Sequence, residues 1–120
     1  MAIVFEHLVK APNGETHIAG RRLTAYDIMC QYELGRTPED IAQSYDLSVA
    51  AVYEALAYAF EHPDEMERIR KADDAAHQRV IDQLPEQVRE IARQTVAADE
   101  QAYREAAGKA REARRGAPVS

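Results

Sequence analysis

The pattern of apolar and polar positions changes twice along the chain, and its first part is typical of short strands. Residues 3–9 combine β-branched and aromatic side chains without a breaker, which predicts a strand. Pro12-Asn13-Gly14 predicts a turn, because proline presets φ and Asn-Gly accepts positive φ. Residues 15–19 are then expected to return as a second short strand that ends at Gly20. Such a hairpin is marginal alone, so it should pack on helices or pair with a second copy.

From Leu23 to His62 apolar residues recur every three or four positions, which predicts three helices. Each helix follows a hydroxyl residue that can cap its first turn, namely Thr24, Thr37 and Ser48. The helices are expected to end at Gly35, at Asp46-Leu47 and at His62-Pro63.

After Pro63 the composition shifts toward Ala, Glu, Gln and Arg, all of which favour helices. Two helices are expected over residues 64–84 and 86–115, separated by Pro85. Thin apolar stripes predict the faces that need a partner surface: Met66, Ile69, Ala76, Val80 and Leu84 on the first helix, and Val88, Ile91, Thr95, Ala98 and Ala102 on the second. We therefore divide the chain into a domain at 1–63, a charged helical arm at 64–115 and a frayed tail at 116–120.

Residues 37–56 have the spacing of a helix-turn-helix, in which Asp46 tolerates a left-handed turn and Ser48 caps the second helix. The fold class predicted is mainly α: a tri-helical helix-turn-helix domain with a short N-terminal β-hairpin and a long C-terminal helical arm. The outward positions of the second helix are predicted to be Ser48, Val49, Ala50, Tyr53 and Glu54.

In a DNA-binding helix-turn-helix, the start of that second helix enters the major groove. The candidate DNA contacts are Ser48, Val49, Ala50 and Tyr53, with Arg21, Arg22 and Arg36 on phosphates. Glu54 would repel phosphates. None of the outward residues is the Arg, Lys, Asn or Gln that pairs bidentately with a base. A tri-helical bundle that contacts only proteins therefore stays open as the alternative.

Charge is distributed unevenly along the 120 residues, whose formal net charge is −6. Residues 1–62 carry four basic and nine acidic side chains, a poor match to non-specific nucleic-acid binding. The end of the arm is basic, because Arg104, Lys109, Arg111, Arg114 and Arg115 face only Glu105 and Glu112.

The sequence contains few features that are typical of an enzyme. It contains no GxGxxG, Walker or GxSxG motif, and its single cysteine, Cys30, excludes an intramolecular disulfide. Asp73 and His77 lie one helical turn apart without a third ligand in register, which favours a solvated helix face over a metal site. We expect no catalytic residues, cofactor or metal, no membrane segment, and a cytoplasmic location. Four tyrosines are expected to pack in the core with hydroxyls at its rim: Tyr26, Tyr32, Tyr45 and Tyr58.

Several short motifs over residues 3–68 resemble domain-of-unknown-function family 433. They are Gly14, Ile18, Gly20-Arg21-Arg22-Leu23, Tyr26-Asp27-Ile28, Gly35, Thr37-Pro38-Glu39-Asp40-Ile41, Tyr45-Asp46-Leu47-Ser48, Val52, Ala55-Leu56-Ala57-Tyr58, His62 and Glu65. Arg21 stands where the family usually has Thr, and the turn at 45–47 is a residue shorter than in many members.

The resemblance implies a VapB-type antitoxin: a homodimer that represses its own promoter and covers the active site of a PIN-like ribonuclease toxin. On that reading Arg104, Lys109, Arg111 and Arg114 bind the toxin's acidic site. The alternative for this segment is a solvated helix end with arginines placed to suit the helix dipole. The alternative for the whole chain is a protein-interaction or dimerisation module that binds no DNA. A small metal-dependent enzyme is a third class, which retained metal would indicate.

Overall fold

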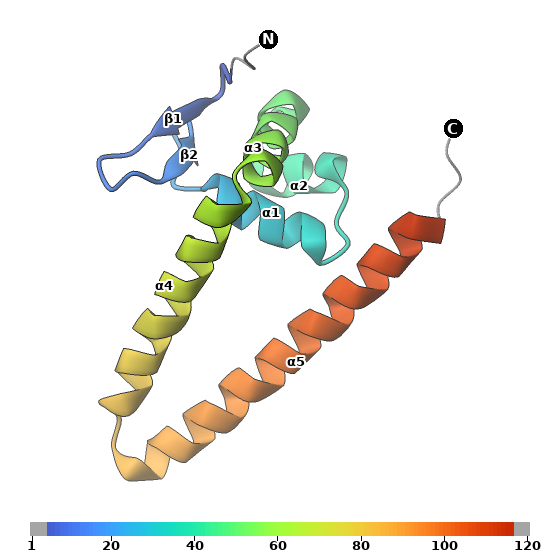
Figure 1. Cartoon of the computed structure of the whole chain (residues 1–120). Helices are drawn as coiled ribbons and strands as arrows, with labels where there is room; N and C mark the ends of the chain where they lie inside the picture. The colour runs from blue at the N-terminus through green and yellow to red at the C-terminus, as the bar shows by residue number, and fades with distance from the viewer. Residues whose placement is uncertain (1–4, 117–120) are drawn as a thin grey trace.

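A computed structural model describes residues 5–116, which form five helices and one two-stranded antiparallel hairpin (Figure 1). The fold is therefore mainly helical, as the sequence predicts. The elements in chain order are β1 (Leu8–Lys10), β2 (Thr16–Ile18), α1 (Ala25–Glu33), α2 (Pro38–Tyr45), α3 (Val49–Glu61), α4 (Pro63–Asp82) and α5 (Glu86–Gly116).

The hairpin pairs Leu8 with Ile18 and Lys10 with Thr16. Its first strand is shorter than predicted, because Glu6 and His7 form a turn; Ile3 and Val4 lie outside the described residues. The length of the partner strand explains the difference. The last hydrogen bond between the two segments runs from the Ala19 N–H to the His7 carbonyl at 2.8 Å, and beyond it the chain turns away at Gly20, whose φ of +75° suits glycine.

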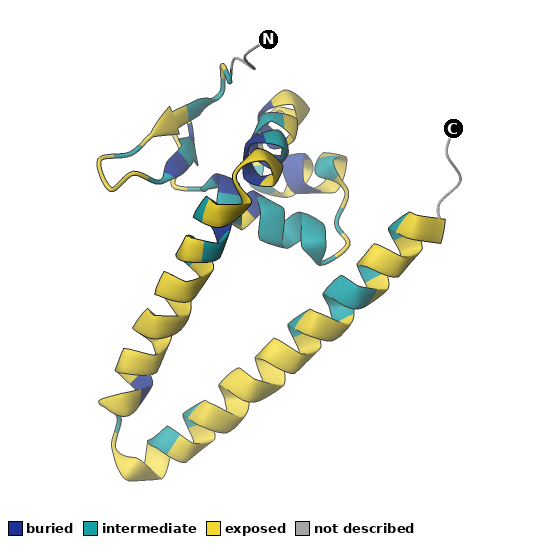
Figure 2. Ribbon diagram, viewed as in Figure 1, coloured by how far each residue is buried: buried dark blue, intermediate teal, exposed yellow. Residues whose placement is uncertain are grey.

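Helices α1, α2 and α3 pack around a small core whose largest fully buried side chains are Ile28, Ile41 and Val52. Figure 2 shows most of the buried residues gathered where these three helices and the end of β2 meet. β2 ends in this core with Ile18, whose backbone N–H donates to the Leu23 carbonyl at 2.9 Å. The hairpin thus packs on the helices, one of the two arrangements that the sequence leaves open.

The predicted helix caps are confirmed. The hydroxyls of Thr24, Thr37 and Ser48 each accept a backbone N–H from the third residue beyond. Asp46 ends α2 at φ 54°, ψ 53°, the left-handed turn expected of it. Short-range hydrogen bonds therefore define where α1, α2 and α3 begin.

Helices α4 and α5 form an open V: α4 leads away from α3, and α5 returns toward α1 (Figure 1). The C-terminal half of α5 docks on α1, where the Tyr103 hydroxyl donates to the Glu33 carboxylate at 2.7 Å. Backbones approach closely beside this contact, because a Cβ added at Gly35 would lie 3.4 Å from the Ala110 Cβ. Gly35 also has a φ of +102°, so glycine serves both the turn and the docking.

The apolar stripes predicted for the arm are partly wrong. On α4, Met66 is buried and Ile69 packs against the core, as predicted, but the buried residue near the turn is Ile81 while Val80 is 60% exposed. On α5 the docked residues are Tyr103, Ala110 and Arg114, outside the predicted stripe. The cause is the angle between the helices: they diverge from the turn at 83–85, so α5 meets α1 with a different face. Gly116, predicted to be frayed, is the last residue of α5; residues 117–120 lie outside the described part.

Candidate functional site

The N-terminal end of α3 presents the face predicted to read DNA. Ser48, Val49, Ala50 and Tyr53 are all exposed, while Val52 and Ala55 on the opposite side are buried. The Tyr53 hydroxyl donates to the Glu39 carboxylate at 2.9 Å, which holds the ring beside α2. This face is therefore apolar and aromatic, with one carboxylate next to it.

Glu54 does not belong to that face, contrary to the prediction. It is half-buried and turned toward the hairpin, where it accepts the backbone N–H of His7 at 3.1 Å and pairs with the His7 ring. Burial alone would raise the pKa of Glu54, but the hydrogen bonds and charge of His7 lower it overall. The reason is the packing of β1 on α3, which no spacing along the helix reveals. One source of phosphate repulsion is thereby removed from the exposed face.

Arg21 closes the C-terminal end of α2. Its guanidinium donates to the carbonyls of Tyr45 and Asp46, the latter at 3.3 Å. Helix α2 has no basic residue in its own last turn, so Arg21 supplies the cation that the helix dipole favours there. The sequence reading missed this role, although the missing basic residue in α2 is a visible signal for it.

The other two arginines predicted to contact phosphates differ in their surroundings. Arg22 is exposed. Arg36 lies along α2 and donates to the Gln31 side chain at 2.9 Å, to the Asp40 carbonyl at 3.3 Å and to the Ser44 hydroxyl. Arg21 and Arg36 thus both brace α2.

Arg114 places a cation at the C-terminal end of α1, as Arg21 does at the C-terminal end of α2. Its guanidinium lies 3.6 Å from the centroid of the Tyr32 ring and donates to the Tyr32 carbonyl, in the last turn of α1. It also reaches the Arg36 carbonyl at 3.5 Å. Helix α1 has no basic residue in its last turn either, so α5 provides it from the far end of the chain.

The remaining arm residues predicted to bind a partner lie on different sides of α5. Arg104 and Arg111 line an open cleft of about 740 Å³ between α1, α4, α5 and the end of α3, whereas Lys109 is exposed and does not line it. Apolar side chains in the cleft include Met29, Phe60 and Met66, and acidic ones include Glu67 and Glu100. The cleft is therefore mixed in character rather than basic.

Cys30 and Tyr103 both line this cleft. Cys30 is half-buried, and burial raises the pKa of its thiol. Burial also raises the pKa of Tyr103, with a further rise from its hydrogen bond to Glu33. Both groups are protonated near neutral pH even at their ordinary pKa values, and the shifts reinforce this, which fits packing between α1 and α5.

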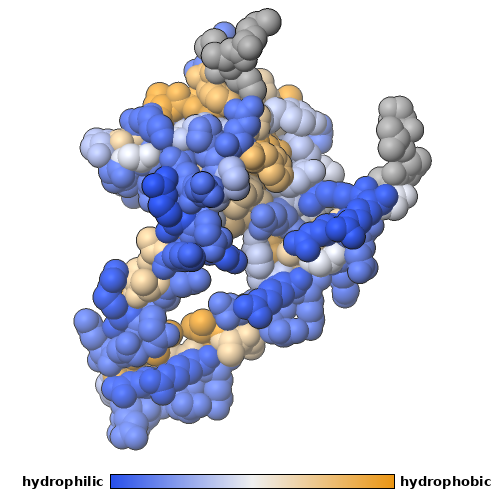
Figure 3. All heavy atoms as spheres, in the orientation of Figure 1, coloured by the Kyte–Doolittle hydropathy of each residue, from blue (hydrophilic) through white to orange (hydrophobic). Residues whose placement is uncertain are grey.

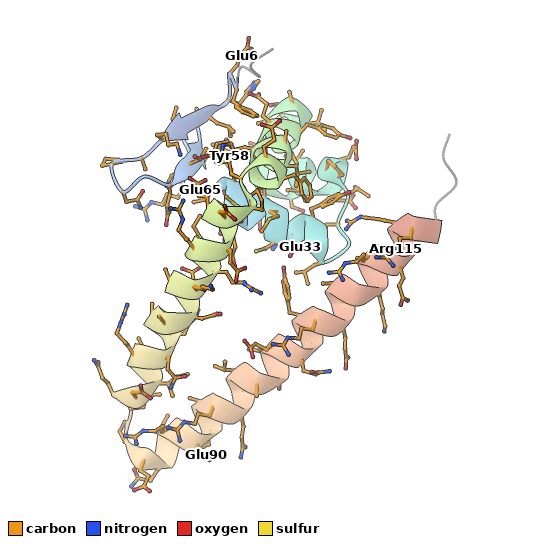
Figure 4. All side chains as sticks on the ribbon, in the orientation of Figure 1. Glu6, Glu33, Tyr58, Glu65, Glu90 and Arg115 are labelled. Atoms are coloured by element: carbon orange, nitrogen blue, oxygen red, sulfur yellow. The ribbon has the colours of Figure 1, made fainter. Side chains whose placement is uncertain are left out.

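A polar cluster joins the hairpin to α3 and α4. Lys10 donates to the Tyr58 hydroxyl at 2.7 Å and to Glu65 at 3.2 Å (Figure 4). Tyr58 itself is buried, with its hydroxyl at this polar rim, as expected for the core tyrosines. Tyr26, Tyr32 and Tyr45 pack half-buried against the same core.

Metal-ligating groups and membrane-spanning helices can be assessed over residues 5–116. Within that range no three His, Cys, Asp or Glu side chains are grouped so that they could hold a metal ion. Asp73 and His77 are exposed on α4. None of the helices in the same range is long and apolar enough to cross a membrane.

Comparison with known proteins confirms the resemblance found in the sequence. Residues 11–59, from the hairpin turn to near the end of α3, match the family described as protein of unknown function, DUF433. This match falls on the segment whose motifs predicted the family. No curated protein and no solved structure matches the chain. The match stops before α4, so the long helical arm lies outside it.

Proposed function

We propose that the chain is a DNA-binding, antitoxin-like transcriptional regulator that acts as a homodimer and neutralises a PIN-like ribonuclease toxin. In this proposal α2 and α3 are a helix-turn-helix, and α3 enters the major groove. The observation that carries it is the exposed N-terminal face of α3, with Val49 42% and Tyr53 51% exposed directly after a capped left-handed turn. The family resemblance adds the antitoxin role.

Each side chain of this face can make only a few kinds of contact with DNA. Ser48 can bond a phosphate or a base edge, and Val49 and Ala50 can touch a thymine methyl group. Arg22 is exposed, and Arg21 holds the turn from which α3 starts. Arg36 also donates hydrogen bonds to α2. To bind a phosphate as well, it has to divide its N–H donors between the phosphate and its present acceptors.

The Ala50→Glu variant tests the proposed DNA face. Ala50 is exposed, so the carboxylate leaves packing intact but meets the phosphates, and we expect DNA affinity to fall at least tenfold. Fluorescence anisotropy on the chain's own upstream DNA and on a scrambled duplex, across a salt series, measures this. Ala75→Glu, on the exposed middle of α4, is the matched control and should bind like the wild type.

The anisotropy result distinguishes a DNA-binding regulator from a module that binds no DNA. Tighter binding of the wild type to native than to scrambled DNA, lost in Ala50→Glu alone, supports the regulator. Equal anisotropy on both duplexes, in the absence and presence of the toxin, would exclude sequence-specific DNA binding.

A second function, a protein-interaction module, is favoured by the exposed apolar side chains of the arm. Val80, Val88 and Ile91 are 60%, 47% and 64% exposed and lie on either side of the turn between α4 and α5, while Figure 3 shows the rest of the arm to be largely hydrophilic. Burying such apolar side chains against a partner helix removes them from water and so favours association. In this reading the arm holds the partner, and the domain supports the arm.

The Ile91→Glu variant tests the arm as a contact surface. We expect co-elution with a coexpressed PIN-like nuclease of the same genome to be lost, because a buried carboxylate without a partner opposes association. Gln94→Glu adds the same charge at another exposed position and serves as the control. Point changes are preferable to removing residues 64–120, because Met66 of α4 belongs to the core. Undiminished co-elution of Ile91→Glu, and of Val88→Glu beside it, would remove the arm as the contact.

A further inference from the structure

A basic groove forms where α5 docks on α1 and the end of α3. A groove of about 350 Å³ runs between α1, the end of α3 and the end of α5; its lining residues are Tyr32, Glu33, Phe60, Ala107, Arg111, Arg114 and Arg115. Three arginines thus meet one carboxylate, that of Glu33, which already accepts the Tyr103 hydroxyl. Figure 4 labels Glu33 on α1 and Arg115 at the end of α5, on two of the elements that border the groove. Phe60 and Arg111 also border the larger, mixed cleft, but on the side of Arg114 and Arg115 the groove is locally basic on a chain whose net charge is −6.

Phe60 gives the groove an accessible aromatic ring. It is 58% exposed, although it is one of only two phenylalanines in the chain and lies on a helix that buries most of its other apolar residues. Its ring meets that of Tyr32 edge to face, with centroids 6.0 Å apart. The guanidinium of Arg114 covers the Tyr32 ring. Planar groups are thus assembled next to one another, and the outermost ring is open to solvent.

We propose that this groove binds a single-stranded nucleic acid, with a base stacked on Phe60 and phosphates paired with Arg111 and Arg115. Aromatic rings beside arginines are the general means by which proteins hold unpaired strands, because every base has a flat face. Arg111 and Arg115 lie one helical turn apart, so their guanidinium groups can bind successive acceptors along one strand.

The groove selects an unpaired strand over a duplex. Bases inside a duplex are stacked on one another and cannot reach Phe60, whereas those of a single strand can be splayed onto it. Phe60 also lies eleven residues beyond Val49 on α3, about 16 Å along the helix, so this surface differs from the proposed duplex-binding face. The two sites are therefore separable by mutation.

The test uses the full chain and a fluorescein-labelled 12-nucleotide oligouridylate, with anisotropy measured across a salt series. Phe60→Leu keeps an apolar side chain but removes the ring, and we expect affinity to fall about fivefold or more. Phe60→Tyr keeps the ring and should bind within about twofold of the wild type. Arg111→Glu should lower affinity at least tenfold and make the remaining binding less dependent on salt. Arg79→Glu, on exposed α4, is the matched charge control and should leave the affinity unchanged.

Several results would overturn the proposal. Failure of the wild type to bind the oligouridylate at low salt is one. Equal binding by Phe60→Leu and Phe60→Tyr is another, because it would indicate plain apolar contact. Tighter binding of a labelled acidic peptide of alternating Glu and Leu would assign the groove to a protein partner instead. Circular dichroism of each variant separates loss of binding from loss of fold. The outcome with Ala50→Glu is independent, because that residue lies at the other end of α3.

Discussion

Replacing Ile41 with alanine is expected to lower the free energy of unfolding by about 2–5 kcal/mol, the range for truncating a buried isoleucine. Ile41 is fully buried where α2 meets α3, so the change leaves a cavity that its neighbours can only partly fill. Urea denaturation followed by circular dichroism measures the loss. The domain is small, so much of its stability depends on a few side chains of this kind.

Ile91→Ala provides the matched control, because Ile91 is 64% exposed on α5. The same deletion of atoms should there change the free energy of unfolding by less than about 0.5 kcal/mol in the dilute monomer. Similar losses in the two variants would contradict the assignment of the core to α1, α2 and α3.

Replacing Arg114 with alanine is expected to release the C-terminal half of α5 from α1. The side chain gives α1 a hydrogen-bonded cation at its C-terminal carbonyls and a guanidinium on the Tyr32 ring. A hydrogen bond from a charged group contributes about 1.5–3 kcal/mol to stability. That is a large share of the docking free energy of a helix that contacts the domain at one end only. Hydrogen exchange should therefore speed up over residues 103–116 and much less over α2 and α3.

Cys30 supplies an independent readout of the same release. In the docked chain burial raises the pKa of its thiol, so little thiolate forms at pH 8 and alkylation by iodoacetamide should be slow. Undocking α5 exposes the thiol and should return its pKa toward the ordinary value, so alkylation should become severalfold faster. Arg115→Ala, next in sequence but exposed, should leave both readouts unchanged. Unaltered exchange and alkylation in Arg114→Ala would mean that Tyr103 and Ala110 alone hold α5 in place.

Two helices of the domain are completed by arginines that are distant in sequence. Neither α1 nor α2 has a basic residue in its last turn, and Arg114 and Arg21 respectively fill those places. Part of the positive charge that suggests nucleic-acid binding is thus also structural. Arg111 and Arg115 line the groove beside Phe60, which is why our inference of strand binding depends on them.

What the sequence by itself determined is local. The starts of α1, α2 and α3 follow from Thr24, Thr37 and Ser48, and the turn at Asp46 follows from its tolerance of the left-handed region, because each effect acts within four residues. The family match, over residues 11–59, lies in this same part of the chain. The break between the two arm helices likewise follows from Pro85.

Only the tertiary structure decided which side chains share a surface. Glu54 turns toward His7 because β1 packs on α3, and Ile81 rather than Val80 is buried because α4 and α5 diverge. Phe60 joins the arginines of α5 because that helix returns across α1. In each case the angle between elements, set by packing over long sequence separations, selects the face that is buried. Helical periodicity predicts that a face exists, but several faces of so alanine-rich an arm could have docked on α1.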